Sequence, residues 1–104
     1  MAQYDVHRNA SDSASGDVPY LLDIQSDLLA QLQTRVVVPL IPADLYGKAI
    51  SRLNPVFDIH GETCVGAFTE LAGVPRSCLG DIVCSVSEQR DDITAAVDFL
   101  LQGF

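Results

Sequence analysis

The stretch from Ser85 to Phe104 constrains the fold most, because it carries the longest helical period in the chain. Its apolar side chains recur at three-, four- and seven-residue spacing: Val86, Ile93, Val97, Leu100 and Phe104. At helical rotation they form one stripe, flanked by Ala96 and Leu101, and this stripe needs a core to pack against. Ser85 and Glu88 match a capping box, which predicts that the helix begins there, and Ser87 is a second N-cap candidate.

Phe99 lies off that stripe, beside Ala95 and Gln102, so the helix is apolar on a second side as well. Two interpretations are open: Phe99 covers the edge of its own core, or it contacts another chain. Asp91 and Asp92 fall in the early turns, where the helix dipole stabilises negative charge.

The residues before this helix alternate between apolar and polar, which is typical of strands. The predicted strands span residues 3–8, 18–25, 34–40, 53–60 and 63–69, with a weaker one at 78–83. The first two form a hairpin around a flexible loop at residues 9–17, and Gly61-Glu62 marks a second hairpin. We expect both histidines, His7 in the first strand and His60 beside the second turn, to face solvent.

Three successive valines in the segment Thr34–Leu40 predict burial on both faces of a sheet. Pro39 cannot donate a ladder hydrogen bond, so we expect the strand to end there at an edge or a bulge. Ser26 is a candidate N-cap of a short, partly helical connection, and Pro42 can start a helical turn. Gly73-Val-Pro75 is predicted to be a loop.

Several antiparallel strands followed by one long terminal helix predict an α+β fold, in which the helix closes or flanks a small antiparallel sheet or barrel. A curled sheet would bury one face around Val36, Val38, Phe57, Ile59, Val65 and Ala67. The chain has 104 residues, so we expect residues 1–104 to form a single domain.

The chain carries 6 basic and 14 acidic residues, a formal charge of −8. Binding to nucleic acid depends on basic side chains that neutralise phosphates, so this charge argues against direct nucleic-acid binding and suits a basic protein partner. The sequence has neither a run of about 18 apolar residues nor an apolar signal segment, so we expect no membrane span and a cytoplasmic protein.

The residues give no pattern typical of catalysis or metal binding. The three cysteines lack the paired spacing of a zinc site and are expected to be free thiols: Cys64, Cys78 and Cys84. Two carboxylate pairs, Asp91-Asp92 and Asp23 with Asp27, are interpreted as a helix N-terminus and the flanks of a turn. These patterns indicate an acidic α+β interaction domain with no catalytic residue, no cofactor and no metal.

Several motifs together resemble the CcdB family, the toxins of the ccd toxin–antitoxin system. These motifs are Leu22-Asp-Ile-Gln-Ser-Asp-Leu-Leu29, Arg35-Val-Val-Val-Pro-Leu40, Pro55-Val-Phe-Asp-Ile-His60, Gly73-Val-Pro75, and Asp92-Ile93 with Gly103 in the terminal helix. The resemblance covers nearly the whole chain.

The resemblance implies an SH3-like barrel or five-stranded sheet, a short accessory sheet and a long C-terminal helix. It implies a homodimer whose two terminal helices end close together, and no enzymatic activity. Toxins of this family bind the A subunit of DNA gyrase and trap its complex with cleaved DNA. A partly disordered CcdA antitoxin wraps the toxin dimer and neutralises it.

The resemblance also assigns a gyrase-binding site in two segments, one after residue 25 and one at the end of the chain. Its residues are Ser26, Leu28, Leu29, Asp98, Leu101, Gln102, Gly103 and Phe104. Of the adjacent leucines, Leu28 and Leu29, we expect one to turn inward and the other to be partly exposed. Leu101 and Phe104 are expected nearest the twofold axis of the dimer.

The last residues depart from the family, which has Trp-Gly-Ile where this chain has Gln102-Gly103-Phe104. In the family the paired tryptophans of the dimer clamp a gyrase arginine, a cation–π contact that Gln102 cannot make. The family also has Asn where this chain has Asp98, and a carboxylate there can pair with the arginine.

Two alternative functions stay open. A ribonuclease toxin of the MazF type shares this barrel but needs basic and acid–base groups to hold RNA. A divergent CcdB-like dimer would bind its antitoxin without poisoning gyrase.

Overall fold

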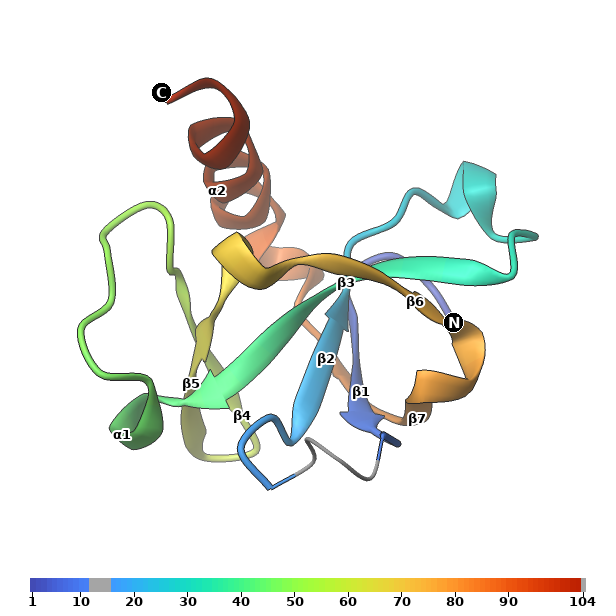
Figure 1. Cartoon of the computed structure of the whole chain (residues 1–104), viewed down its shortest axis with the longest axis horizontal. Coiled ribbons are helices and arrows are strands. Elements are labelled where there is room, and N and C mark those ends of the chain that lie inside the picture. Colours follow the sequence, from blue (N-terminus) through green and yellow to red (C-terminus); the bar gives the residue numbers. More distant parts are fainter. Residues whose placement is uncertain (12–15, 104) are drawn as a thin grey trace.

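The computed structural model describes residues 1–11 and 16–103. Within these residues the main element is a curled antiparallel sheet, in the order β4-β5-β3-β2-β1-β7 with β6 paired to β3 (Figure 1). Its seven strands are β1 (Asp5–Asn9), β2 (Tyr20–Asp23), β3 (Thr34–Pro42), β4 (Val56–Ile59), β5 (Glu62–Gly66), β6 (Ala72–Pro75) and β7 (Leu79–Ser85). The predicted α+β class is confirmed.

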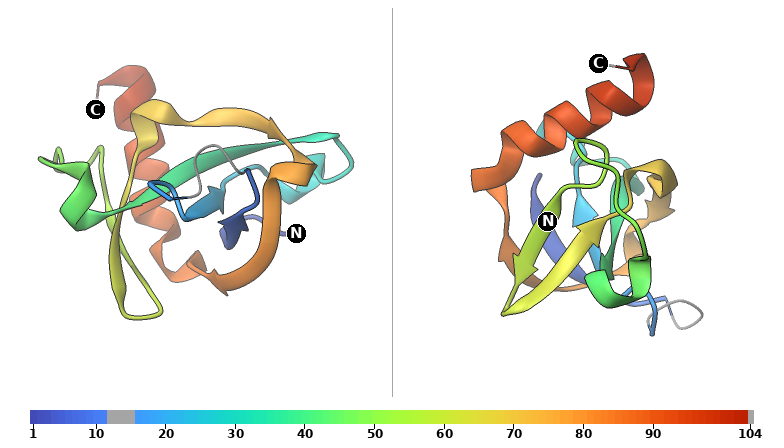
Figure 2. Two further views of the ribbon diagram at one scale, coloured as in Figure 1. Left: turned by 60° about the horizontal axis from the view of Figure 1, so that its bottom comes forward. Right: turned by 90° about the vertical axis from the view of Figure 1, so that its left-hand side faces the viewer.

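Helix α2 (Arg90–Gln102) lies across one end of the curled sheet, as the right-hand view of Figure 2 shows. Helix α1 (Ala43–Tyr46) is a single turn after β3, with Pro42 at its N-cap as expected. Short 3₁₀ helices join the other elements: η1 (Asp27–Leu29), η2 (Phe68–Glu70), η3 (Arg76–Cys78) and η4 (Ser87–Gln89).

Both predicted hairpins are present. Strands β1 and β2 pair antiparallel, with His7 opposite Leu21. Strands β4 and β5 pair with Ile59 opposite Glu62, so the turn residues are His60 and Gly61, one position earlier than predicted. Both turn residues have positive φ, 51° and 85°, as a two-residue hairpin of type I′ requires. His60 is exposed, as predicted.

The concave side of the sheet and helix α2 enclose the larger hydrophobic cluster, here called the first core. Its buried members are Val6, Leu22, Val38, Leu40, Leu53, Phe57, Ile59, Cys64, Phe68, Val86, Ile93 and Ala96. Val97, Phe99 and Leu100 pack against it, so Phe99 covers the edge of its own core, the first of the two interpretations. Val65 and Ala67 are buried as expected, whereas Val36 is only half-buried.

The opposite side of the sheet buries a smaller cluster, here called the second core, formed by Leu21, Val37 and Leu79. His7 also lies on this side and is 2% exposed, so the prediction that it faces solvent was wrong. Strand β1 is an interior strand, covered by β2 on one side and β7 on the other. The His7 Nδ1 donates to the Gly80 carbonyl at 2.9 Å, a hydrogen bond that takes the place of one to water.

Strand β3 does not end at Pro39 as predicted but continues to Pro42. Its neighbour on one side changes from β6, opposite residues 34–37, to β5, opposite residues 40–42. Pro39 sits at this change, where its carbonyl accepts from Ala67 N and its missing N–H breaks no ladder pair. The segment Gly73–Pro75, predicted as a loop, belongs to strand β6.

Helix α2 begins at Arg90, later than the capping box predicted. Ser85 is still part of β7, opposite Asp5, and Val86 N donates to the Tyr4 carbonyl, so both residues are held in the sheet. The Ser85 hydroxyl accepts from Ser87 N at 3.3 Å and stabilises η4 instead. Asp91 and Asp92 occupy the first turn of α2, as predicted.

The predicted flexible loop at residues 9–17 lies partly outside the described residues, and Phe104 lies wholly outside them. In residues 1–11 and 16–103, no helix combines the length and the apolar character that crossing a membrane requires.

Candidate functional site

The first predicted site segment forms η1. Ser26 is its N-cap, and the Ser26 hydroxyl accepts from Leu28 N at 3.2 Å, so the predicted cap is confirmed. Leu28 is 95% exposed and Leu29 is 50% exposed. The prediction that one of the two leucines turns inward was therefore wrong. Together with Leu32, which is 49% exposed, and Asp27, the two leucines line a hollow of about 290 Å³.

The second predicted segment is the last turns of α2. Asp98, Leu101, Gln102 and Gly103 are all exposed, and Leu101 keeps 74% of its surface in solvent. Gly103 has φ 82°, and its N–H donates to the Phe99 carbonyl at 2.9 Å, which ends the helix in the left-handed conformation that glycine favours. The predicted site residue Phe104 lies outside the described part of the chain.

A hollow of about 210 Å³ is lined by α2, by the N-terminal residues and by Ile24, which follows β2. Asp98 and Thr94 line it from α2, and Tyr4 and Ile24 from the sheet side. Gln3 lines it too, and its N–H donates to the Asp27 carboxylate of η1 at 2.8 Å. Gln3 therefore lines one hollow with Asp98 and is bonded to Asp27, while Leu28 and Leu29 line the separate hollow at η1.

Gln3 and Tyr4 were not predicted as site residues. Tyr4 has φ 74°, a strained value for a bulky residue. Two backbone hydrogen bonds hold it, from Tyr4 N to the Asp23 carbonyl at 2.7 Å and from Val86 N to the Tyr4 carbonyl at 2.9 Å. No local pattern in the sequence indicates that the N-terminus reaches the helix; the signal exists only in the tertiary structure.

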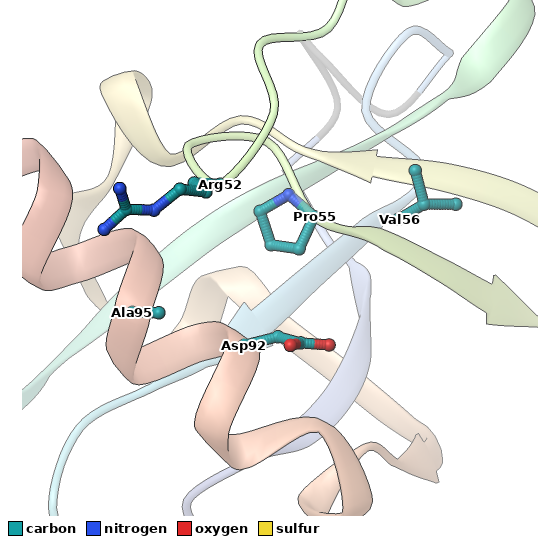
Figure 3. Close-up of a pocket in the computed structure, with 5 residues that line it drawn as sticks. All are labelled: Arg52, Pro55, Val56, Asp92 and Ala95. Atoms are coloured by element: carbon teal, nitrogen blue, oxygen red, sulfur yellow. The ribbon is translucent and has the colours of Figure 1, made fainter.

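A third hollow, of about 300 Å³, lies on another side of α2 (Figure 3). Asp92 and Ala95 line it from the helix, facing Arg52, Pro55 and Val56. The Arg52 guanidinium stacks 4.9 Å above the centre of the Phe99 ring. This cation–π contact fixes the loop before β4 against the helix and explains the half-buried state of Phe99.

A buried ion pair lies beneath η1. The Arg35 Nε donates to Asp23 Oδ2 at 2.9 Å, and Arg35 Nη2 lies 2.7 Å from the same oxygen, with both side chains fully buried. Asp23 was interpreted as a solvated residue flanking a turn, which was wrong. The pairing partner comes from β3, twelve residues later, and no local pattern predicts it.

The described residues contain no cluster of three or more His, Cys, Asp or Glu side chains that could hold a metal ion. All three cysteines are free thiols. The pKa of Cys64 is raised to about 11, chiefly by burial, with smaller contributions from the Glu62 and Asp58 carboxylates. Burial also raises the pKa of Cys84, with smaller contributions from Asp5 and Asp58. Both thiols are therefore poor nucleophiles at neutral pH.

A family model described as "CcdB protein" matches residues 3–103. The chain belongs to the CcdB family. CcdB-family membership makes it a toxin of the toxin–antitoxin type, as the resemblance implied. Among solved structures, an "Endoribonuclease from Mycobacterial species" aligns with a TM-score of 0.74. That alignment covers 97% of this chain and 90% of the other, at 14% identity, so it shows that the two share a fold.

Proposed function

We propose that this CcdB-family protein is a gyrase-directed toxin that acts by binding, without catalysis, as a homodimer. The observation that supports this most is the position of Gln3, which lines one hollow with Asp98 and donates to Asp27, the residue before the exposed Leu28. Exposed leucines offer apolar contact area to a protein partner. The Asp98 carboxylate suits a basic side chain of that partner.

The composition of the surface around Asp98 favours an arginine of the partner. Asp98 borders a hollow whose other walls include the Tyr4 ring and the Ile24 and Val97 side chains. A guanidinium entering such a hollow can pair with the carboxylate while its flat face lies on apolar groups. This arrangement would replace the contact that the family makes with Trp at the position of Gln102.

The proposal is tested by inducible expression in a gyrase-sensitive host and in a host with CcdB-resistant gyrase. We expect growth arrest only in the first host, and accumulation of cleaved DNA when purified protein is added to gyrase and supercoiled plasmid. Leu28→Asp should abolish both effects. Equal arrest in both hosts would contradict the gyrase target, and no arrest in either would favour the divergent, antitoxin-binding alternative.

The proposed homodimer is supported by Leu101, which is 74% exposed at the end of a helix that otherwise packs well. Sedimentation velocity at micromolar concentration should give a dimer, and Leu101→Asp should shift it to a monomer. Leu45→Asp is a matched control, because Leu45 is 58% exposed on α1, away from the helix end. A monomeric parent protein would contradict the dimer, and a dimeric Leu101→Asp variant would contradict this placement.

The proposed antitoxin partner is a segment with basic and apolar side chains that folds on binding. The formal charge of −8 supports this, as do the hollows at η1 and beside Asp98, each of which combines one carboxylate with apolar side chains. Affinity for the C-terminal segment of the cognate antitoxin should fall as salt rises. A titration that is insensitive to salt would count against it.

The ribonuclease alternative is favoured only by the shared fold. Basic side chains that could hold RNA are scattered: Arg8, Arg76 and Arg90 lie on three different elements, Lys48 and Arg52 lie in the connection between α1 and β4, and Arg35 is buried. RNA recognition needs phosphate contacts from clustered cations. An assay with structured and single-stranded RNA should show no cleavage; cleavage that copurifies with the protein would overturn the proposal.

A further inference from the structure

The connection that carries Leu28 and Leu29 has almost no hydrophobic anchor of its own. None of the three residues of η1 is buried, and both leucines point their apolar surface into solvent. A segment of this kind has little apolar burial to fix its conformation. Its conformation must therefore come from polar contacts with the sheet beneath it.

The side chain of Gln25, which is 6% exposed, makes the connection between the sheet and η1. Its Oε1 accepts from Val36 N at 2.9 Å, and its Nε2 donates to the Leu29 carbonyl at 3.0 Å. Strand β2 ends at Asp23, whereas β3 extends beyond it, so the Gln25 amide takes the place of the missing strand carbonyl opposite Val36. The same amide thereby ties η1 to the middle of the sheet.

Gln25 is itself held from below by the buried ion pair. Its backbone N–H donates to Asp23 Oδ1 at 3.0 Å, while Asp23 Oδ2 accepts from Arg35. All three side chains are buried in low dielectric, where a hydrogen bond is strong and an unpaired group is costly. One continuous network therefore runs from β3 through β2 to the exposed leucines.

We infer that Gln25 is a positioning residue, which fixes Leu28 and Leu29 in the conformation that the protein partner binds. This inference rests on the proposed function, because it takes gyrase as that partner. A pre-fixed loop loses less conformational freedom on binding than a mobile one. Gln25 contributes to affinity in this way without touching the partner.

The test compares Gln25→Met with the parent protein in a titration against the gyrase A dimerisation domain. Met has a similar volume and removes both side-chain hydrogen bonds, so affinity should fall about five- to tenfold, the scale of one lost buried hydrogen bond. Asn54→Leu is the matched control. Asn54 is 5% exposed, and its amide also accepts from one backbone N–H and donates to one carbonyl, those of Ile50 and Gly66, away from η1. It should leave gyrase affinity unchanged.

A double-mutant cycle separates positioning from general destabilisation. In a Leu28→Ala/Leu29→Ala background, Gln25→Met should have no further effect on gyrase affinity, because the groups that it positions are gone. An equal additional loss in that background would overturn the inference. Parent-like affinity of the Gln25→Met single variant would overturn it as well.

Amide hydrogen exchange decides the inference even if the parent protein does not bind gyrase, which would refute the proposed function alone. The N–H groups of Leu29, Ala30 and Leu32 make the hydrogen bonds of η1 and the turn after it. In Gln25→Met they should exchange at least about tenfold faster, as should the Val36 amide, which loses its acceptor, with the other amides of β3 unchanged. Unchanged exchange at these three amides would overturn the inference.

Discussion

The two sides of the curled sheet bury side chains of different chemistry. The first core, between the sheet and α2, contains only apolar residues and a thiol, with two phenylalanines, Phe57 and Phe68, at its centre. On the side of the second core, three apolar residues share the interior with His7, Asp23 and Arg35. The two sides also support different elements, since α2 closes the first and the connection that carries Leu28 and Leu29 is tied to the second.

The second core also leaves polar atoms unsatisfied. Arg35 Nη1 and His7 Nε2 are buried and have no hydrogen-bond partner among the described residues. Such atoms cost stability, because they have lost their hydrogen bonds to water without gaining others. The first core should therefore respond to changes in volume, and the second to changes in charge.

The largest expected effect is on the second core. Arg35→Ala leaves the Asp23 carboxylate buried and unpaired, which should lower the free energy of unfolding by about 3–5 kcal/mol. Replacing both partners, as Asp23→Leu with Arg35→Met, should restore most of that loss, because no buried charge remains. Urea unfolding followed by circular dichroism measures both variants. A double variant as unstable as Arg35→Ala would contradict the charge-based account.

A smaller effect is expected in the first core. A Cβ added at Gly66 would lie 2.9 Å from Phe68 Cε1 and 3.0 Å from Phe57 Cε2, closer than packed carbons allow. Gly66→Ala should therefore lower the free energy of unfolding by about 1–3 kcal/mol through overpacking. Gly73→Ala is the control, because its added Cβ would meet nothing within 4 Å. Equal stability of both variants would show that the aromatic pair can shift freely.

The smallest effect is a pH dependence of the first core. The Cys64 pKa is raised from 9.0 to about 11 in the folded protein, chiefly by burial. Between these values the unfolded chain loses the thiol proton while the folded chain keeps it, so stability should fall as pH rises from 9 to about 11. Below that window the contribution is fully present. Cys64→Val should show a shallower decline in urea midpoints over this window; an identical decline would exclude Cys64 as its source.

The same comparison explains what the sequence could predict. The first core was predictable because its residues alternate within strands or repeat at helical spacing, as Phe57 with Ile59 and Ile93 with Val97 do. These are local patterns, and they identified the hairpins and the terminal helix. The predicted start of α2 was wrong because Ser85 and Val86 pair with the N-terminal segment, and no local pattern encodes this pairing.

The second core was not predictable in the same way. His7 and Asp23 have the sequence pattern of surface residues. His7 is buried beside β7, and Asp23 is buried because it pairs with Arg35, and neither neighbour can be predicted from local sequence. Strand β6 was not predicted because Gly73 and Pro75 are typical of a loop. The segment forms a strand because it pairs with residues 34–37 of β3. Ser26, Leu28 and Leu29 were assigned through the family resemblance, but Gln3 and Tyr4 join the site only in three dimensions.

The central claim is that this CcdB-family chain binds a gyrase arginine through the Asp98 carboxylate. In the family, the Trp at the position of Gln102 makes that contact. The most direct test is a titration of four proteins against the gyrase A dimerisation domain: the parent, Asp98→Ala, Gln102→Trp and Asp91→Ala. Asp91 is an exposed carboxylate on the same helix and outside the hollow, so its variant controls for net charge.

We expect the parent to bind and Asp98→Ala to lose about 1.5–3 kcal/mol, the scale of a hydrogen bond to a charged group. Gln102→Trp should bind as tightly or more tightly, since it restores an aromatic contact for the arginine. Asp91→Ala should match the parent. An Asp98→Ala variant that binds like the parent would contradict the role of the carboxylate, and no binding by any of the four would contradict gyrase as the target.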